Sequence, residues 1–360
     1  MAKIAILSFY SGIVERGVET FAYEVAKRLA IKHKVTVFQA GHTMPRGFKV
    51  EEIKTFVSPP RGSKGILGKL YLDWQSTKIW IFTLKTLLYL FKEKFDVIIP
   101  LNGGWQSLIL RIVSKITGAK ILISGHAGIG SDDAANLLFR PDVFVALTTP
   151  EADWAKKLVP EVKTVLIPNG VDLARFNPKV KPKNIPLAKP IVICCSAVVP
   201  YKRVDLTIKA VAKTSNLSLL ILGDGQMRGS IDSLGKRLLA KRYLRLVVPY
   251  EQIPQYYRAC RVFSLASQTE AFGISYVEAM ACNLPIVTTR DNSRAEIIGQ
   301  AGILTDPTNV NQYAKDLEMA AKTNYYNKPY NQSLKYSWNK IAERYATQIT
   351  ELLSAKSIPQ

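Results

Sequence analysis

The segment EAFGISYVE, residues 270–278, begins and ends with a glutamate and contains Gly273. It follows an apolar strand, and we expect a helix to begin near Gly273, where a glycine allows a close backbone approach. The first N–H groups of a helix lack intrahelical partners, and the helix dipole is positive there. We therefore expect the amides of Phe272, Gly273 and Ile274 to face an anion, and a diphosphate fits this place.

The two glutamates suit a different part of such a ligand. A carboxylate repels phosphate, but it accepts hydrogen bonds from hydroxyl groups. Because Glu270 and Glu278 flank the expected phosphate position, we predict that they bind sugar and ribose hydroxyls at the two ends of the ligand.

Basic side chains that can hold phosphates occur in CCSAVVPYKRVDLTIKA, where Lys202 and Arg203 lie between a buried strand and an amphipathic helix. There they can clamp phosphates and neutralise the charge of a leaving group. The segment LLILGDGQMR turns at Gly223 and Gly225 directly after its strand, a usual position for a nucleotide loop. A solvated Lys-Arg pair and an ordinary Gly-Asp-Gly turn are the alternatives that the residues alone leave open.

The first half of the chain has two further candidate loops. His126 in ISGHAGIG is flanked by Gly125 and Gly128, so the backbone there can approach a ligand closely. A purely structural histidine is the alternative. After the first strand, Arg16 and Gly17 open a helix. Arg16 could contact a phosphate or an anionic acceptor substrate, and a solvated side chain is the alternative.

The elements that must position these loops form two alternating patterns of apolar runs and helical stretches. The expected strands are Lys3–Phe9, Lys34–Gln39, Val97–Pro100 and Lys120–Ser124, followed by Ile191–Ala197, Ser218–Gly223, Leu244–Val248, Val262–Ala266 and Pro285–Thr288. We therefore predict an α/β protein with two Rossmann-like, doubly wound parallel-sheet domains. Their ligand is expected in a cleft at the carboxyl ends of the strands.

Proline spacing suggests where the domains divide. Pro178, Pro182, Pro186 and Pro190 recur every four residues, which stiffens a segment that cannot pack as a helix or central strand. We predict an acceptor-binding domain over 1–176, a linker over 177–190 and a donor-binding domain over 191–336. The apolar face of a helix over 337–354 is expected to pack back on the first domain.

Composition narrows the class of protein. The chain of 360 residues is 48% hydrophobic and carries a formal net charge of +21, which attracts phosphorylated ligands, anionic lipids or nucleic acid. Four cysteines and three histidines without zinc-site spacing predict no metal and no cofactor. No apolar run reaches the roughly 18 residues of a membrane span, and the opening MAKIAILSFY is too short in apolar residues for a signal peptide, so we expect a cytoplasmic location.

One segment of the first domain is unusually apolar. Over residues 61–95, Lys78, Lys85 and Lys92 lie seven apart on one helical face, and most other positions after Trp80 are apolar. This pattern fits a core helix with a solvated lysine stripe. It also fits a surface that attaches the protein peripherally to the inner, anionic face of a membrane carrying a lipid-linked acceptor.

The motifs ILGDGQMR, PYKRVDLTIKA and EAFGISYVEAMACNLPIV resemble, in order and spacing over about residues 190–310, those of the family 4 retaining glycosyltransferases of the GT-B fold. VLIPNGVDLARF and YSWNKIAERY extend the resemblance. It implies that Lys202 binds the donor diphosphate, Glu270 contacts the transferred sugar and Glu278 binds the nucleotide ribose. It also places His126 beside the transferred sugar, in a positioning and electrostatic role.

Three positions depart from the family pattern. Many members have an arginine at the position of Ala197 and a glycine at that of Asn283. The family's Gly-Gly-x-Glu turn lies near the donor phosphates, and only its second glycine is kept here, as Gly17, which the resemblance therefore implies to be donor-binding. Ala197 removes a phosphate contact, and we predict that Arg203 compensates for it.

The resemblance implies transfer of a hexosyl unit, with retention, from a nucleoside diphosphate sugar to a glycan or lipid-linked acceptor hydroxyl, as in polysaccharide or glycolipid biosynthesis. We expect the transfer to be metal-independent, because Lys202, Arg203 and the helix amides near Gly273 can stabilise the charge of the leaving group. The sequence favours GDP-mannose, with UDP-glucose and UDP-N-acetylglucosamine as alternative donors. A nucleic-acid-binding protein and a non-catalytic sugar-nucleotide-binding protein on a related fold are the alternative functions. No recognition helix, zinc finger or RNP pattern supports nucleic acid as a partner.

Overall fold

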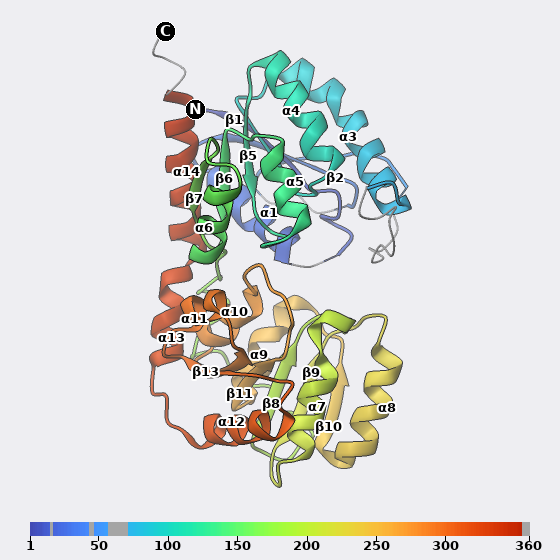
Figure 1. Ribbon diagram of the computed structural model, residues 1–360, viewed down its shortest axis with the longest axis vertical. Helices are drawn as coiled ribbons and strands as arrows, with labels where there is room; N and C mark the ends of the chain where they lie inside the picture. Colours follow the sequence, from blue (N-terminus) through green and yellow to red (C-terminus); the bar gives the residue numbers. More distant parts are fainter. Residues whose placement is uncertain (15–16, 43–46, 57–70, 355–360) are drawn as a thin grey trace. The chain divides into compact units, whose positions relative to one another are not determined.

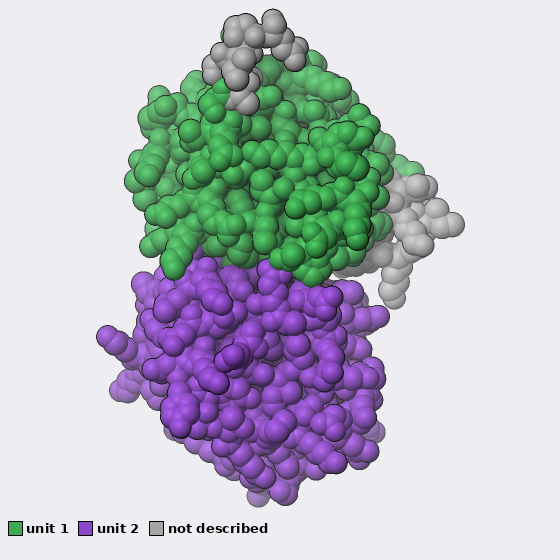
Figure 2. Space-filling view, turned by 60° about the vertical axis from the view of Figure 1, so that its left-hand side comes forward, with its two compact units in different colours: residues 1–169, 338–360 green, residues 170–337 purple. Residues whose placement is uncertain are grey.

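The computed structural model describes residues 1–14, 17–42, 47–56 and 71–354 (Figure 1). By its contacts the chain divides into two compact units, coloured separately in Figure 2. Unit 1 comprises Met1–Asn169 and Trp338–Gln360, and unit 2 comprises Gly170–Ser337. The predicted boundary at residue 176 lies inside unit 2, because Phe176 is buried against Tyr250 and Tyr257, with ring centroids 5.6 and 6.2 Å away.

Unit 1 is built on a parallel sheet of seven strands in the order β3-β2-β1-β4-β5-β6-β7. The strands are β1 (Lys3–Leu7), β2 (Lys34–Gln39), β3 (Lys49–Glu52), β4 (Val97–Pro100), β5 (Lys120–Ser124), β6 (Val143–Ala146) and β7 (Lys163–Leu166). The helices are α1 (Gly17–Leu29), α3 (Trp74–Glu93), α4 (Trp105–Thr117), α5 (Ser131–Leu138), α6 (Thr149–Leu158) and α14 (Trp338–Ser354). Apolar runs make β1, β4 and β6 almost wholly buried, as expected for parallel strands covered by helices.

Unit 2 has a parallel sheet of six strands in the order β10-β9-β8-β11-β12-β13. The strands are β8 (Ile191–Cys195), β9 (Ser218–Leu222), β10 (Tyr243–Leu246), β11 (Val262–Leu265), β12 (Ile286–Thr289) and β13 (Gly302–Thr305). The α-helices are α7 (Val204–Ala212), α8 (Arg228–Leu239), α9 (Ile253–Ala259), α10 (Ile274–Ala281), α11 (Asn292–Ile298), α12 (Val310–Lys322) and α13 (Lys328–Ser333). Four 3-10 turns complete it: η1 (Pro200–Lys202), η2 (Ala240–Arg242), η3 (Tyr250–Gln252) and η4 (Leu334–Tyr336).

The last helix, α14, belongs to unit 1. α14 packs against α1, and Phe21 of α1 contacts Tyr345 with 5.4 Å between ring centroids. The Tyr345 hydroxyl also hydrogen-bonds Ser124 Oγ at the end of β5, over 3.0 Å. The apolar stripe of α14 is thus buried on the sheet domain formed by the first half of the chain.

Both sheets have the connectivity of doubly wound folds. In unit 2 the chain runs outward from β8 through β9 to β10, then returns to place β11 on the other side of β8. In unit 1 the strand order reverses in the same way between β1 and β4. Ligands of open parallel sheets bind beyond the carboxyl ends of the strands at such reversals, so β8 and β11 mark the first place to look in unit 2.

None of the helices in the described part of the chain combines the length and the apolar character needed to cross a membrane. On α3, Lys85 and Lys92 are exposed, but Lys78 is 3% exposed, so the prediction that it lies on a solvated stripe was wrong; burial in unit 1 removes it from the surface.

Candidate functional site

Lys202 and Glu270 meet at the strand reversal of unit 2. β8 and β11 are neighbouring parallel strands, and the loops that follow them carry Lys202 and Glu270. Lys202 Nζ forms an ion pair with Glu270 Oε1, and these side chains are only 15% and 10% exposed. The two loops are also joined by the Gln268 amide, which donates to the Tyr201 carbonyl over 2.8 Å. The pair predicted from separate motifs is therefore assembled at one point.

Arg203 is directed at the backbone of the β11 loop. Its φ of 47° places it in the left-handed region, and it joins η1 to α7. Its Nε donates to the Ala266 carbonyl over 2.8 Å, and Nη2 donates to Thr289 Oγ1 over 3.3 Å. These bonds give Arg203 a role in fixing the loop that carries Glu270. Its compensating contact with phosphate stays a prediction.

Arg294 supports the same loop and was missed by the sequence reasoning. It is 2% exposed, and its Nη2 donates to the Ser267 carbonyl over 3.0 Å. Its Nε donates to the Tyr276 hydroxyl over 3.2 Å, while its partner Asp291 caps α11. An arginine in the first turn of a polar helix gives no sequence signal of burial, because Ser267 and Tyr276, which hold it, are distant in the sequence.

The N-terminus of α10 has the geometry expected for close approach of an anion. Gly273 is its N-cap, with φ 83°, and no side chain caps the helix. A Cβ on Gly273 would lie 2.4 Å from the Tyr276 ring, so a side chain is excluded there. Ile274 is the first helical residue. Phe272 is 2% exposed and packs on Tyr336, so only its backbone can serve the predicted role.

Glu278 lies on α10 in a pocket of tyrosines. It is 5% exposed and accepts hydrogen bonds from the hydroxyls of Tyr250, over 2.5 Å, and Tyr257, over 3.5 Å. Burial raises the pKa of the Glu278 carboxyl to about 7, although the two tyrosine bonds oppose that shift. The Arg175 guanidinium lies over the Tyr250 ring, 5.1 Å from its centroid. The carboxyl is therefore poised to change charge near neutral pH.

Gly223 and Gly225 bring the loops after β9 and β8 together. A Cβ would lie 1.9 Å from the Ser196 carbonyl oxygen at Gly223, and 2.4 Å from that of Val198 at Gly225. The Val198 amide donates to the Asp224 carbonyl over 2.9 Å. The two glycines therefore allow the loops after β8 and β9 to lie in direct contact. Ala197, in the loop after β8, is exposed.

In unit 1, His126 lies directly after β5 with its ring packed on Phe21, 4.4 Å between centroids. Its Nε2 is buried and has no hydrogen-bond partner among the described residues. Burial lowers the pKa of His126 to about 3, so the imidazole is neutral at ordinary pH. The following backbone is held by Asp133, whose Oδ2 accepts from the amides of Ala127 and Gly128 over 3.0 and 2.8 Å.

A buried carboxyl beneath this loop was also missed. Glu151 is 1% exposed, and its Oε2 accepts from the Leu147 amide over 2.7 Å. Burial raises the pKa of the Glu151 carboxyl to about 9. A Cβ on Gly125 would lie 2.2 Å from Glu151 Oε1, which explains the glycine before His126.

The first loop of unit 1 is only partly described. Gly17 is exposed and is the first residue of α1, as predicted, whereas Arg16 lies outside the described residues. Gly12 and Gly41 bring the loops after β1 and β2 into contact, since a Cβ on Gly41 would lie 2.2 Å from the carbonyl carbon of Gly12. The Phe9 amide donates to Asn102 Oδ1 over 2.9 Å, which links the β1 and β4 loops at the strand reversal.

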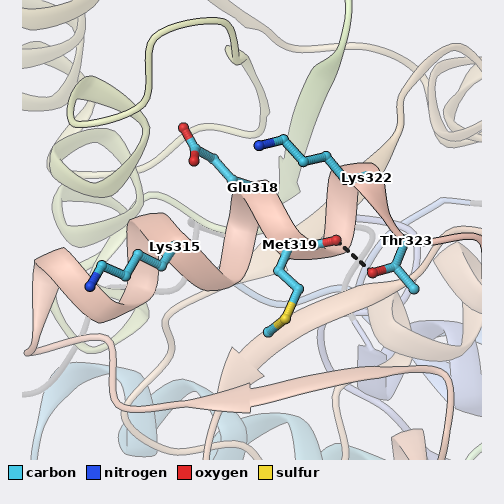
Figure 3. A pocket seen from close by; sticks show the side chains of 5 residues that line it. All are labelled: Lys315, Glu318, Met319, Lys322 and Thr323. Carbon is cyan, nitrogen blue, oxygen red and sulfur yellow. Dashed lines mark hydrogen bonds between the residues drawn. The ribbon is translucent and has the colours of Figure 1, made fainter.

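A hollow of about 410 Å³ on the surface of unit 2 lies elsewhere, along α12. Figure 3 shows its lining side chains projecting from this one helix, and they are Lys315, Glu318, Met319, Lys322 and Thr323. None of the predicted site residues contributes to it. Across the described residues, no group of three or more His, Cys, Asp or Glu side chains is placed to hold a metal ion. The candidate site therefore rests on the strand-end loops.

Comparisons with known proteins identify the relatives of this chain. The family model described as Glycosyl transferases group 1 matches residues 176–336, and the model described as Glycosyltransferase Family 4 matches residues 16–175. The structure is similar to sucrose-phosphate synthase from Thermosynechococcus elongatus, with a TM-score of 0.79, 18% identity and coverage of 99% of this chain and 100% of that one. It is also similar to Anabaena HepE in complex with UDP and glucose, with a TM-score of 0.72, 19% identity and coverage of 98% and 100%.

Among curated proteins, the GDP-mannose-dependent alpha-(1-6)-phosphatidylinositol monomannoside mannosyltransferase of Mycolicibacterium smegmatis is 26% identical over 44% of this chain. The match spans about half of that relative, 47% of its length. One subunit of the human phosphatidylinositol N-acetylglucosaminyltransferase is 24% identical over 91% of this chain and 72% of its own length. The two family models together account for residues 16–336, and each sheet domain matches its own model. The chain therefore belongs to the family 4 glycosyltransferases, which have the GT-B fold.

Proposed function

We propose that the protein transfers a hexosyl unit from a nucleoside diphosphate sugar to an acceptor hydroxyl, and that the donor binds to unit 2. The observation that carries this proposal is the meeting of Lys202, Glu270 and the uncapped N-terminus of α10 around the β8–β11 strand reversal. This place offers cations and free amides for a diphosphate, with carboxylates on either side for hydroxyl groups.

In the proposed complex the donor diphosphate lies against Lys202 Nζ and the first amides of α10. Glu270 accepts hydrogen bonds from the transferred sugar, and Glu278 accepts them from the ribose. The ion pair with Lys202 keeps the Glu270 side chain in place before the donor arrives. Arg203 and Arg294 hold the loop that carries Glu270. The donor-binding side chains are therefore positioned before the donor binds.

The reaction that these groups support is a substitution with retention at the anomeric carbon. The bond from that carbon to the phosphate oxygen breaks, and a bond to the acceptor oxygen forms on the same face. The proton of the acceptor hydroxyl passes to the departing phosphate oxygen. Lys202 and the α10 amides stabilise the negative charge that develops on the diphosphate, so no metal ion is required in this scheme.

For the donor we propose GDP-mannose, in line with the sequence motif and with the GDP-mannose named for the Mycolicibacterium relative. UDP-glucose and UDP-N-acetylglucosamine are the competing donors, since the Anabaena structure holds UDP and glucose. For the acceptor we propose a glycan or a lipid-linked hydroxyl, because two relatives carry phosphatidylinositol in their names.

A thermal-shift screen with GDP, UDP, ADP and their sugars tests the donor site. A ligand at about 100 times its dissociation constant adds roughly 2.7 kcal/mol to the free energy of unfolding. We expect GDP and GDP-mannose to raise the melting temperature most, and Lys202→Ala to reduce the shift. The absence of a shift with every nucleotide would overturn the assignment.

With a donor identified, NMR of the product's anomeric signal separates retention from inversion. Turnover measured in excess EDTA tests the metal-independent scheme. An inverted product or complete loss of turnover in EDTA contradicts the proposed mechanism while leaving the donor site intact.

A further inference from the structure

Two tyrosine hydroxyls occupy the carboxyl group of Glu278. Its Oε1 accepts a hydrogen bond from Tyr250, and its Oε2 accepts one from Tyr257. Glu278 is 5% exposed, so little of the carboxyl surface is open to a further ligand. A carboxylate accepts hydrogen bonds but donates none, so each of its ligands must bring an O–H or N–H group. Protein hydroxyls therefore already lie where we propose that the ribose hydroxyls of the donor bind.

The two tyrosine bonds differ in strength. The Tyr250 oxygen lies 2.5 Å from Glu278 Oε1, a length typical of a hydroxyl bound to an ionised carboxylate. The Tyr257 oxygen lies 3.5 Å from Oε2, which is at the outer limit for a hydrogen bond. A ribose hydroxyl that approaches Glu278 must therefore compete mainly with Tyr250.

The two tyrosines also differ in their freedom to move aside. Tyr257 is wholly buried on α9, with its ring centroid 5.9 Å from that of Phe263 in the sheet. Tyr250 is half-buried in the short turn η3, between the exposed residues Pro249 and Glu251. Rotation of the Tyr250 side chain toward solvent leaves α9 and α10 in place, whereas rotation of Tyr257 would open the core. Tyr250 is thus the hydroxyl that can leave the carboxyl.

Contacts with the segment before the linker keep Tyr250 on Glu278 in the free protein. The Arg175 guanidinium lies over the Tyr250 ring, 5.1 Å from its centroid, and the Phe176 ring centroid is 5.6 Å away. The charge of Arg175 also favours the ionised form of Glu278 and so opposes the rise in its pKa. A cation over an aromatic ring is a modest interaction, so it favours this position of Tyr250 without locking it.

We propose that the Tyr250 hydroxyl takes the place of a ribose hydroxyl on Glu278 in the free protein and leaves when the nucleotide-sugar binds. This inference rests on the proposed function, because it takes Glu278 as the ribose ligand. The exchange breaks one hydrogen bond to the buried carboxylate and forms another, so the charge keeps a donor throughout. Tyr250 consequently lowers the affinity for the donor, and the return of its hydroxyl helps the nucleoside diphosphate product to leave.

Calorimetry of Tyr250→Phe measures this competition. The ligands are GDP, UDP and ADP, each compared with its 2′,3′-dideoxy form, at about pH 9, above the pKa of about 7 of Glu278. In the variant a ribose hydroxyl supplies a missing donor to the buried carboxylate instead of displacing one. We therefore expect the nucleotide that binds the native protein to bind about fivefold more tightly or better. Its dideoxy form should bind both proteins equally, because it brings no ribose hydroxyl.

Two further variants are the controls. Tyr257→Phe removes the hydroxyl that stays in place, so we expect no gain in affinity. Tyr326→Phe changes a tyrosine that is 74% exposed, and the affinity should stay native. Circular dichroism melting establishes that each variant is folded. An unchanged or lower affinity in Tyr250→Phe, an equal gain in Tyr257→Phe, or an equal gain for the dideoxy form overturns the proposal.

Fluorine NMR follows the exchange without removing the hydroxyl. With 3-fluorotyrosine placed at position 250 of the otherwise native protein, the nucleotide that binds should shift the fluorine signal as the ring leaves Glu278. A nucleotide that binds without moving this signal contradicts the role of Tyr250 and leaves the donor site standing. If none of the three nucleotides binds the native protein, the proposed function fails, and the role of Tyr250 fails with it.

Discussion

The hydroxyl of Tyr250 donates a hydrogen bond of 2.5 Å to Glu278 Oε1, from the 3-10 turn η3 to the helix α10. Tyr257, on the helix after η3, donates to the other oxygen of the same carboxyl. These bonds stabilise the ionised form of Glu278, but burial of the side chain outweighs them and raises its pKa to about 7. Glu278, which we propose binds the ribose, therefore has a carboxyl group that titrates in the physiological pH range.

This pKa links the stability of the protein to pH. Glu278 binds its proton more tightly in the folded chain than in the unfolded chain, whose ordinary value is 4.5. The folded state is therefore favoured below pH 4.5, and that contribution is lost as pH rises to 7. Relative to Glu278→Gln, the native protein should lose up to about 3 kcal/mol of unfolding free energy between pH 5 and 8.

Urea unfolding of both proteins at several pH values measures this difference. The comparison with Glu278→Gln is needed because Glu151, with a pKa raised to about 9, gives the native protein a slope of the same sign. A constant difference between native and variant across pH 5 to 8 contradicts the titration of Glu278.

Donor binding should also depend on the ionisation of Glu278, but donor affinity should rise with pH whereas the contribution of Glu278 to stability falls. An ionised carboxylate accepts hydrogen bonds from both ribose hydroxyls, whereas the protonated form has one oxygen occupied as a donor. We expect the affinity for an intact nucleotide-sugar to rise several-fold from pH 6 to 8, with a midpoint near 7. Calorimetry with Glu278→Gln should give a flat profile, and a flat profile for the native protein argues against a ribose contact.

Gly273 is expected to tolerate no side chain. Gly273→Ala places a Cβ at φ 83° and 2.4 Å from the Tyr276 ring. We expect a loss of more than about 1 kcal/mol of unfolding free energy and weaker donor binding, because the start of α10 must shift.

Gly229→Ala is the matched control. Gly229 lies in α8, and a Cβ there meets nothing within 4 Å. Alanine in an unstrained helical position usually stabilises by about 0.4 to 1 kcal/mol. If both glycine variants change stability and donor binding alike, the proposed strain at Gly273 is refuted.

The fold was largely predictable because the apolar runs are continuous. The strands expected at Lys34–Gln39, Val97–Pro100 and Lys120–Ser124 have those bounds in the structure. The edge strands Lys49–Glu52 and Gly302–Thr305 were missed, the first because it is polar and only half-buried, and the second because it is short and begins with a glycine. The strands Val143–Ala146 and Lys163–Leu166 were missed as well, because four residues are too few for a clear periodic signal. Continuous apolar runs predict most of the buried strands, but the missed strand Val143–Ala146 shows that a short run inside the sheet gives too weak a signal.

The site was predictable only where a residue follows a strand. Lys202, Glu270 and Gly273 were found from their place in post-strand loops, which a parallel sheet brings to one edge. Arg294 was missed because its partners Ser267 and Tyr276 are distant in the sequence. Glu151 was missed because a charged residue in a polar helix normally lies in solvent. The spatial partners, rather than the local pattern, decide whether such a side chain is buried.

The Lys202–Glu270 ion pair should matter more for donor binding than for folding. Lys202→Ala removes a charged donor from the proposed diphosphate site, and such bonds contribute about 1.5 to 3 kcal/mol. We expect the affinity for the donor to fall about tenfold or more, and Glu270→Gln to lower turnover more than affinity.

Lys209→Ala provides the control for removing a lysine from this region. Lys209 pairs with Asp205 on the exposed surface of α7, where an ion pair contributes at most about 1 kcal/mol. Donor affinity should be unchanged in this variant. A similar loss of affinity in Lys202→Ala and Lys209→Ala would indicate a general charge effect instead of a phosphate contact.

His126 should influence turnover without setting its pH dependence. Its pKa is lowered to about 3, because the ring is buried against Phe21 without a partner for Nε2 among the described residues. The imidazole is therefore neutral from pH 5 to 8, and its ring signals in NMR should not shift over that range. His126→Asn should lower kcat while the shape of the pH profile stays that of the native enzyme. If the imidazole titrates near neutrality, or if the substitution removes a limb of the profile, His126 exchanges a proton during the reaction and its role is not confined to positioning the sugar.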